Sequence, residues 1–371
     1  MNSIVRDLLS RATVPSTPRE APKPKPPVKV TSDDEELENV LKGLKTTIKV
    51  FGCGGGGCNT VNRLAEEGVI GAELHALNTD AAHLLTVHSH RKILLGRRLT
   101  RGLGAGAIPH VGEDAAKESE DELRKAVQGA DLVFVTCGLG GGTGTGSAHV
   151  VARMAKESGA LVMGVCTLPF KAEGMQRMEN AEYGLEKLRA VADTVITIPN
   201  DKLLELVPRL PIAQAFKVAD EVLMRAIKGV TEIISKPGLV NLDFNDIKTI
   251  MKGGGVAMIG LGESQSDNRA HDAIEEAINS PLLDVDIGEA HGALINVNGG
   301  HNMTISEAEG MAEYVATRIS PNARIIWGAS LDDELADRIS VLVIITGVKS
   351  KQIVGPDSRL RGRKAGLDVV T

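Results

Sequence analysis

The sequence is poor in the features that would place a protein in a membrane, outside the cell or on nucleic acid. Aromatic residues make up only 2% of the 371 residues. No apolar run approaches the roughly 18 residues that a membrane-spanning helix needs, and residues 1–19 contain no apolar stretch typical of a signal peptide. The formal net charge of −6 argues against nucleic acid as a main partner. We therefore expect a cytoplasmic protein with no direct membrane insertion and no nucleic-acid partner.

Several familiar site motifs are also absent. The four cysteines, at positions 53, 58, 137 and 166, lack CxxC spacing and have no accompanying histidine cluster, which favours buried reduced thiols over a metal site or disulfides. No GxxxxGK[ST] motif occurs, so a P-loop with its lysine is excluded. The chain also lacks an Asn-Lys-x-Asp element of the Ras type for reading guanine.

Glycine, in contrast, is concentrated in two short segments. Five of the seven residues from Gly140 to Gly146 are glycine, after an apolar run at 131–137 that predicts a buried strand and before a helix-like stretch at 147–156. A glycine-rich turn at a helix N-terminus directs bare backbone N–H groups and the positive end of the helix dipole at one spot, which suits phosphate. Thr143 and Thr145 can add hydroxyl donors to phosphate oxygens or to a metal-bound water.

A second glycine segment, residues 52–57, follows a strand pattern at 47–51 and precedes a helix pattern at 59–67. Its glycines satisfy GxGxxG, the weak fingerprint of a Rossmann dinucleotide site, so an NADH-binding oxidoreductase is one alternative. The next strand, at 73–77, ends in Asn78-Thr79-Asp80. A NAD enzyme seldom needs a second phosphate cradle, whereas a nucleoside triphosphate can use two, and the triphosphate interpretation is therefore preferred.

The pattern of elements predicts an α/β protein in several parts. Strands and helices alternate from residue 46 to about 208, as in a doubly wound parallel sheet, and a long central helix links this domain to a second, smaller α/β domain with a mixed sheet. The predicted boundaries are 1–31 for a proline-rich disordered arm, 32–211 for the nucleotide-binding domain with a leading helix, 212–236 for the central helix, 237–348 for the C-terminal activation domain and 349–371 for a flexible basic tail.

These motifs, in this order, resemble those of the tubulin/FtsZ family and, within it, the cell-division FtsZ proteins of archaea. The matching elements are Gly140–Gly146, Gly54–Asn59, Asn78–Asp80, Leu103–Pro109, Pro169–Arg177, Phe216–Asp220 and Asn241–Asp246. The resemblance covers residues 46–348 and implies a GTPase that polymerises head to tail into filaments at the division site. It implies GTP or GDP and Mg²⁺ at the site, a second copy of the chain as partner, and a membrane-tethering division protein.

The resemblance also implies which residues touch the nucleotide. They are Gly54, Gly55, Gly56, Gly57, Cys58, Asn59, Asn78, Asp80, Gly140, Gly141, Gly142, Thr143, Gly144, Thr145, Gly146, Glu173, Arg177, Phe216 and Asp220. Glu173 and Arg177 would hold the ribose and a nearby phosphate, although their spacing also suits an ordinary ion pair on a helix. Phe216 would stack on the base unless it belongs to the core, and Asp220 would accept from guanine. Asn78 and Asp80 would approach the metal through water, with no residue as a direct ligand.

Hydrolysis, by the same resemblance, uses Asn241, Asp243 and Asp246 of a neighbouring subunit. Permanent carboxylates in a subunit's own pocket would repel the triphosphate, whereas a borrowed loop closes over it only in a filament. From the residues alone, an aspartate at the start of the helix at 245–251 is at least as well explained by N-terminal capping.

Two further points stay open on the sequence. Residues 367–370 loosely resemble the short peptide with which FtsZ relatives dock tethering proteins, but the segment is equally typical of a solvated tail, and the proline-rich arm is the other candidate. The alternative function is that of a nucleotide-binding, weakly catalytic or non-catalytic tubulin-like filament protein that regulates cell shape.

Overall fold

The computed structural model describes residues 46–206, 212–236, 238–240, 242–283 and 287–348. The predicted arm, leading helix and tail, and Asn241 among the predicted catalytic residues, lie outside the described residues. The described residues from Thr46 onward belong to one compact unit.

The first half of the fold is a six-stranded sheet in the order β3-β2-β1-β4-β5-β6, in which every pair of neighbours is parallel. Its strands are β1 (Ile48–Cys53), β2 (Ala72–Asn78), β3 (Arg91–Leu94), β4 (Leu132–Gly138), β5 (Leu161–Leu168) and β6 (Thr194–Pro199). The strand order reverses at β1, which lies between β2 and β4. This arrangement confirms the predicted doubly wound sheet, and it creates a topological switch point between β1 and β4, where ligands bind in such folds.

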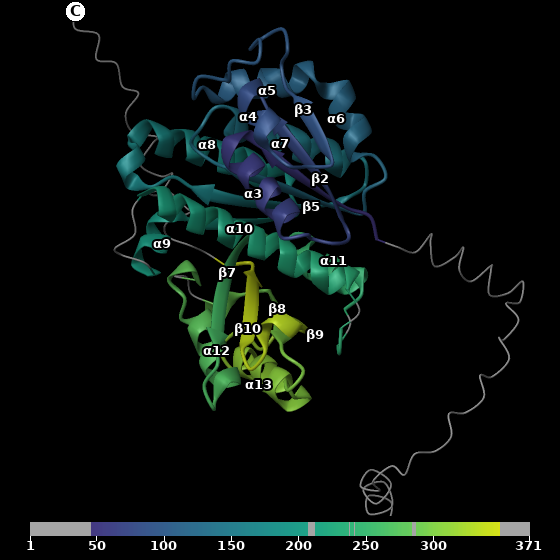
Figure 1. The fold of residues 1–371 in the computed structure, drawn as a ribbon, viewed down its shortest axis with the longest axis vertical. Coiled ribbons are helices and arrows are strands. Elements are labelled where there is room, and N and C mark those ends of the chain that lie inside the picture. The colour runs from purple at the N-terminus through teal and green to yellow at the C-terminus, as the bar shows by residue number, and fades with distance from the viewer. Residues whose placement is uncertain (1–45, 207–211, 237, 241, 284–286, 349–371) are drawn as a thin grey trace, which may run out of the picture. The chain divides into compact units, whose positions relative to one another are not determined.

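Helices cover both faces of this sheet because its strands alternate apolar residues between two cores (Figure 1). Val133 and Val135 of β4 join the core with helices on one face, while Leu132 and Phe134 join the core on the other. On the first face lie α5 (Pro109–Glu118), α6 (Glu120–Val127), α7 (Thr143–Glu157) and α8 (Met175–Val191), and on the second lie α3 (Gly54–Glu66), α9 (Asn200–Leu206) and α10 (Ile212–Ser235). Two short elements, α4 (Ala81–Thr86) and η1 (Lys171–Glu173), sit in connections.

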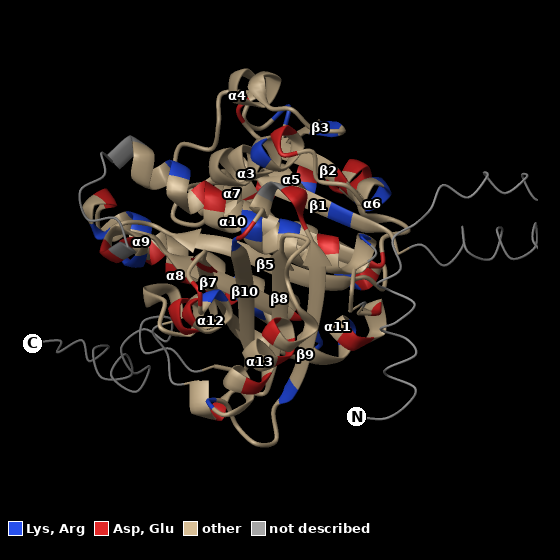
Figure 2. Cartoon of the chain, turned by 60° about the horizontal axis from the view of Figure 1, so that its bottom comes forward, with Lys and Arg blue, Asp and Glu red and all other residues tan. Residues whose placement is uncertain are grey.

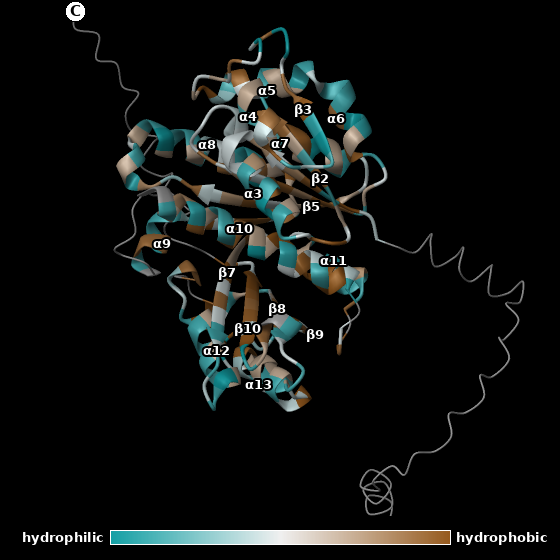
Figure 3. Ribbon diagram, viewed as in Figure 1, coloured by the Kyte–Doolittle hydropathy of each residue, from teal (hydrophilic) through white to brown (hydrophobic). Residues whose placement is uncertain are grey.

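The predicted central helix is α10, which has 24 residues. Its apolar side contributes Leu223, Ile227 and Val230 to the second core, and teal and brown stretches alternate along it in Figure 3. The spacing of apolar residues in the sequence predicted this amphipathic helix.

The second half of the fold is a mixed sheet, as expected. Its strands are β7 (Gly255–Ser264), β8 (Gly292–Gly299), β9 (Arg324–Leu331) and β10 (Ile339–Thr346), in the order β7-β10-β8-β9. The β10 strand is antiparallel to both β7 and β8, whereas β8 and β9 are parallel. Its helical elements are α11 (Phe244–Met251), α12 (Arg269–Ile278), α13 (Ile305–Ala316), η2 (Pro281–Leu283), η3 (Ile287–Glu289) and η4 (Asp333–Leu335). Strand β7 also pairs in parallel with β6, so one ten-stranded sheet runs through both halves.

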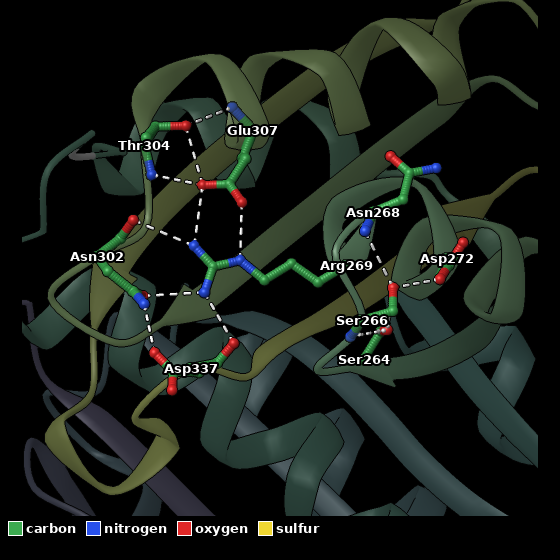
Figure 4. A network of polar contacts seen from close by, with 9 residues as sticks. All are labelled: Ser264, Ser266, Asn268, Arg269, Asp272, Asn302, Thr304, Glu307 and Asp337. Carbon is green, nitrogen blue, oxygen red and sulfur yellow. Dashed lines mark hydrogen bonds and ion pairs between the residues drawn. The ribbon is translucent and has the colours of Figure 1, made fainter.

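A polar network centred on Arg269 ties α12 to α13 (Figure 4). Its Nε and Nη2 atoms donate to the two carboxylate oxygens of Glu307 at 2.7 and 3.2 Å, and its Nη1 donates to the carbonyl oxygen of Asp337 at 2.7 Å. Glu307 also completes a capping box with Thr304 at the start of α13. Because the Arg269 guanidinium and the Thr304 donors favour the charged form, the pKa of Glu307 falls to about 2.

Candidate nucleotide-binding site

The two glycine segments lie against each other at the carboxyl ends of β1 and β4. A Cβ atom on Gly54 would lie only 2.6 Å from the backbone nitrogen of Gly144, and one on Gly56 would lie 3.1 Å from the nitrogen of Gly138. Gly54 also has a φ of 70°, in the left-handed region. Segments far apart in the sequence therefore form one backbone surface, which is possible because both lack side chains.

Each glycine segment forms the start of a helix. The sequence predicted helices beginning only after the glycines, but α3 begins at Gly54 and α7 at Thr143. Neither N-terminus is capped by a side chain. A Cβ on Gly55 or on Gly141 would meet no heavy atom within 4 Å, so both glycines face open space. Two helix N-termini with uncapped first turns thus converge at the switch point, which is the arrangement that binds phosphate.

The two threonines of the second segment are buried and bonded within the protein. The Thr145 hydroxyl oxygen accepts from the Gly140 N–H at 2.9 Å. The hydroxyl oxygens of Thr143 and Thr79 lie 2.6 Å apart and share a hydrogen bond. In this structure the predicted phosphate donors therefore brace the glycine segment and link it to the end of β2.

A histidine that sequence reasoning missed organises the polar side chains beside the first segment. His83 Nδ1 lies 3.1 Å from the Nδ2 of Asn78, and its Nε2 lies 3.1 Å from the Oδ1 of Asn59. Because an amide nitrogen donates and an amide oxygen accepts, this pairing places the imidazole proton on Nε2. Asp80 caps α4, accepting from the His83 N–H at 3.0 Å. The signal in the sequence was this cap, since the histidine follows Asp80 by three residues.

Glu173 and Arg177 form the ion pair that their spacing suggested, with 2.7 Å between the Glu173 Oε2 and an Arg177 terminal nitrogen. The structure also brings this pair to the glycine segment, because a Cβ on Gly140 would lie 2.9 Å from the Arg177 carbonyl oxygen. Glu173 Oε1 accepts from the Phe170 N–H at 2.9 Å, which orients the carboxylate. Both proposed roles of the pair are therefore compatible with its position.

Phe216 and Asp220 lie one turn apart at the start of α10. Phe216 is 41% exposed and makes a T-shaped contact with buried Phe170, with 5.1 Å between ring centroids, so part of its ring is open to solvent. Burial raises the pKa of Asp220 to about 6, against the opposing effects of Arg63 and of a hydrogen bond from Asn59. A partly buried carboxylate beside an exposed aromatic ring suits a flat ligand with N–H donors.

The predicted catalytic carboxylates are not brought to the glycine segments. Contacts from Arg63 to Glu221, from Glu67 to Lys228 and from Ile70 to Ser235 show that α10 runs parallel to α3, away from the glycines. From Asp220 to Ser235 the helix axis advances about 22 Å. Figure 1 shows α11 beyond that end of α10. The two aspartates lie at the start of α11, Asp243 as its N-cap and Asp246 in its first turn.

Asp243 and Asp246 are both exposed at the start of α11, where Figure 2 marks acidic residues in red. Asp243 caps the helix, accepting from the Asp246 backbone N–H at 3.0 Å. The capping interpretation therefore holds, and it leaves the Asp246 carboxylate unused by the cap.

Cys58, at a position predicted to contact the nucleotide, points its side chain into the core. Its thiol donates to the carbonyl oxygens of Gly52 and Leu77 at 3.6 and 3.5 Å, and burial raises its pKa to about 12. If Cys58 contacts a ligand, it does so through its backbone. The other three cysteines are likewise buried and free.

Comparison with known proteins agrees with this geometry. The family model described as "Tubulin/FtsZ family, GTPase domain" matches residues 47–208, and the model "FtsZ family, C-terminal domain" matches residues 255–349. The cell division protein FtsZ 1 of Archaeoglobus fulgidus is 59% identical over 337 residues, which is 91% of this chain and 92% of that protein.

The chain belongs to the tubulin/FtsZ family. FtsZ 1 of Pyrococcus abyssi is 60% identical over 323 residues, covering 87% of each chain. Among solved structures, the FtsZ dimer of M. jannaschii superposes with a TM-score of 0.82 at 54% identity, covering 85% of this chain and 92% of that one. CetZ2 from Haloferax volcanii, at 21% identity and a TM-score of 0.70, shares the fold.

Within the residues that the structure describes, no helix is both long and apolar enough to cross a membrane. Among the same residues, no group of three or more His, Cys, Asp or Glu side chains is placed to hold a metal ion.

Proposed function

We propose that this chain binds and hydrolyses GTP at the glycine segments and polymerises head to tail into filaments at the division site. The observation that carries the proposal is the convergence of two uncapped helix N-termini at the β1/β4 switch point. Family membership supports GTP as the nucleotide, and the relatives named cell division protein FtsZ support the cellular role.

The positions of these side chains define where the phosphates, the ribose and the base of the nucleotide lie in the site. The phosphates lie over the first turns of α3 and α7, and the ribose lies beside Glu173 and Arg177. The base stacks on the exposed part of the Phe216 ring, and the Asp220 carboxylate accepts from the N1 and N2 donors of guanine. Adenine lacks those donors, so the same carboxylate would be desolvated without a partner.

Mg²⁺ fits this site as a cation carried by the phosphates. Asp80 is already a helix cap and Asn78 is paired with His83, so both reach a metal through water at most. Mg²⁺ commonly keeps several waters and relies on substrate phosphates, which agrees with such a sparse set of protein ligands. When bound, it would neutralise charge on the phosphates during transfer.

The carboxylates that act on the attacking water come from the next subunit. Asp243 and Asp246 are exposed at the opposite end of α10 from the base pocket, so their own subunit cannot deliver them to its own phosphates. A head-to-tail contact places the α11 end of one subunit over the glycine segments of another. Such a contact is heterologous and does not close, and it therefore extends into filaments.

The test is the GTPase rate per molecule as a function of protein concentration. We expect a threshold above which the specific activity rises, because only assembled subunits possess a complete site. A constant specific activity down to monomer concentrations would contradict the shared site. Filaments that bind GTP without turnover would favour the non-catalytic alternative, and NADH binding with indifference to GTP would favour an oxidoreductase.

Attachment to the membrane requires a separate tethering protein, which we propose binds the C-terminal tail. The tail carries six basic residues and ends in a short apolar-acidic stretch, Gly366–Thr371. Deleting residues 352–371 should leave GTPase activity and polymerisation in solution unchanged and disperse the protein from the division site in cells. Normal localisation of that truncation would assign tethering elsewhere, first to the proline-rich arm.

A further inference from the structure

The side chain of Asn180, to which no contact with the nucleotide has been assigned, links three parts of the candidate nucleotide site. Asn180 lies on α8, one turn after Arg177. Its Nδ2 donates to the carbonyl oxygen of Gly140 at 3.3 Å and to that of Ala107 at 3.1 Å. Both N–H bonds of one amide nitrogen are thus used on backbone carbonyls.

Both carbonyls belong to residues with a positive φ. Gly140 has a φ of 102° and Ala107 a φ of 59°, and for an alanine the left-handed region is unfavourable. The Gly140 N–H is also bonded, to the Thr145 hydroxyl at 2.9 Å. Gly140 is therefore held on both sides, by α7 through its N–H and by α8 through its carbonyl.

Fixing the Gly140 carbonyl also fixes the direction of the next N–H. In a planar trans peptide the C=O and N–H groups point in opposite directions. The Gly141 N–H therefore points away from Asn180. Gly141 itself faces open space, since a Cβ there would meet no heavy atom within 4 Å. The hydrogen bond from Asn180 thus aims a backbone donor into the proposed phosphate site.

The second bond holds the segment that covers the glycines. A Cβ on Gly142 would lie 2.8 Å from the Cβ of Ala105 and 2.8 Å from the nitrogen of Ile108, so residues 105–108 lie directly on the second glycine segment, residues 140–146. Anchoring the Ala107 carbonyl to α8 keeps this cover in place.

We propose that Asn180 is a positioning residue for phosphate binding, which orients the Gly140–Gly141 peptide and holds residues 105–108 over the second glycine segment. This inference rests on the proposed function, because it assumes that nucleotide phosphates occupy the glycine segments. It predicts that Asn180 matters for phosphates and not for the base, which lies against α10.

The decisive variant is Asn180→Asp, which keeps the shape of the side chain and replaces the donor by an acceptor facing two carbonyl oxygens. Below the polymerisation threshold, we expect affinity for GTP and GDP to fall about tenfold, while affinity for guanosine, which has no phosphate, stays unchanged. In assembled protein, KM for GTP should rise more than kcat falls. Asn180→Ala, which adds no charge, should show the same pattern with a smaller loss.

Two neighbours on α8 provide matched controls. Gln176→Ala removes the weak bond to the Asn180 Oδ1 and leaves both Nδ2 bonds, and Glu179→Gln changes an exposed charge beside it. Both should bind GTP as the wild type does. Unchanged GTP affinity in both Asn180 variants, or an equal loss for GTP and guanosine, would overturn the inference while leaving the proposed function intact. Failure of the wild type itself to bind GTP would instead overturn the proposed function.

Discussion

The two ends of α10 present aspartates in opposite environments. At its N-terminal end, Asp220 is partly buried beside Asn59 and Arg63, and burial raises its pKa. Beyond its C-terminal end, Asp243 and Asp246 are exposed on α11. A buried carboxylate can select a ligand in its own subunit, whereas an exposed one gains a function only when another surface covers it. We propose that the same residue type serves recognition at one end and hydrolysis across a subunit contact at the other.

The contrast between the aspartates at the two ends of α10 is tested most strongly by the Asp246→Ala variant. Because Asp243 caps α11 through the backbone N–H of residue 246, this variant keeps the cap and loses only a carboxylate. We expect kcat to fall about 10²-fold or more, as for loss of a general base, with GTP affinity unchanged and filaments longer-lived. Turnover assays and sedimentation would measure both effects.

Mixing the variant with wild type separates a shared site from a self-contained one. Each Asp246→Ala subunit should disable the site of its neighbour, so activity should fall with the fraction of junctions that contain a variant loop. Asp267→Ala, at another exposed aspartate, is the matched control and should behave as wild type. Activity that equals the simple sum of two separate populations would place the carboxylates in their own subunit's site.

The role of the aspartate at the N-terminal end of α10 is tested by the Asp220→Asn variant, for which we expect a smaller effect. The amide cannot accept from guanine as a carboxylate does, so GTP affinity should fall about 10- to 100-fold, while ATP affinity changes little. Competition binding with both nucleotides measures this. Equal affinity of the wild type for GTP and ATP would show that the base pocket lies elsewhere.

The raised pKa of Asp220 adds a pH dependence with a definite sign. In the wild type, GTP affinity should rise as pH increases through about 6, because the carboxylate must ionise to accept from guanine. Stability of the nucleotide-free protein should change in the opposite sense. A folded-state pKa above the unfolded value gives stability that is present at low pH and lost as pH rises from about 4 to about 6. Asp220→Asn should abolish both dependences.

The architecture was accessible from the sequence because local patterns determine it. The apolar spacing of residues 212–236 predicted α10 to within a few residues, and the sequence also predicted a mixed sheet in the second half of the fold. The starts of α3 and α7 were misplaced, since glycine is a poor helix former and only the close approach of Gly54 to Gly144 explains its place in a first turn.

The remaining features of the candidate site depend on tertiary contacts, which could not be predicted from local sequence patterns. His83 and Asn180 reach other residues of the candidate site through partners 24 and 40 residues away, respectively. The Asp80 cap is a local signal for His83, whereas no local pattern signals Asn180. The burial of the Thr145 hydroxyl against Gly140 is likewise a consequence of packing. The roles given to Asp243 and Asp246 came from the resemblance, because their local pattern indicates only a helix cap.

The smallest effect on nucleotide handling is expected from Arg269, in the part of the fold that carries α11 but lies outside the site. Its side chain is 12% exposed and holds Glu307, Asn302 and the Asp337 carbonyl together. Arg269→Ala should destabilise the protein by about 2–3 kcal/mol, since it leaves a partly buried carboxylate without its partner. Arg153→Ala, which removes a 46%-exposed arginine 3.9 Å from Glu157, should cost at most about 1 kcal/mol.

Denaturant unfolding at several pH values would measure how much stability the Arg269→Ala and Arg153→Ala variants each lose. The pKa of Glu307 is lowered to about 2, so its pairing contributes stability above the unfolded value that is lost as pH falls towards 2. The gap between wild type and Arg269→Ala should therefore close in acid. At neutral pH, folded Arg269→Ala should bind GTP as tightly as wild type, because its network touches neither α3 nor α7. Weakened GTP binding in the folded variant would mean that the C-terminal half contributes to the site within one subunit, and the contrast between the two ends of α10 would fail.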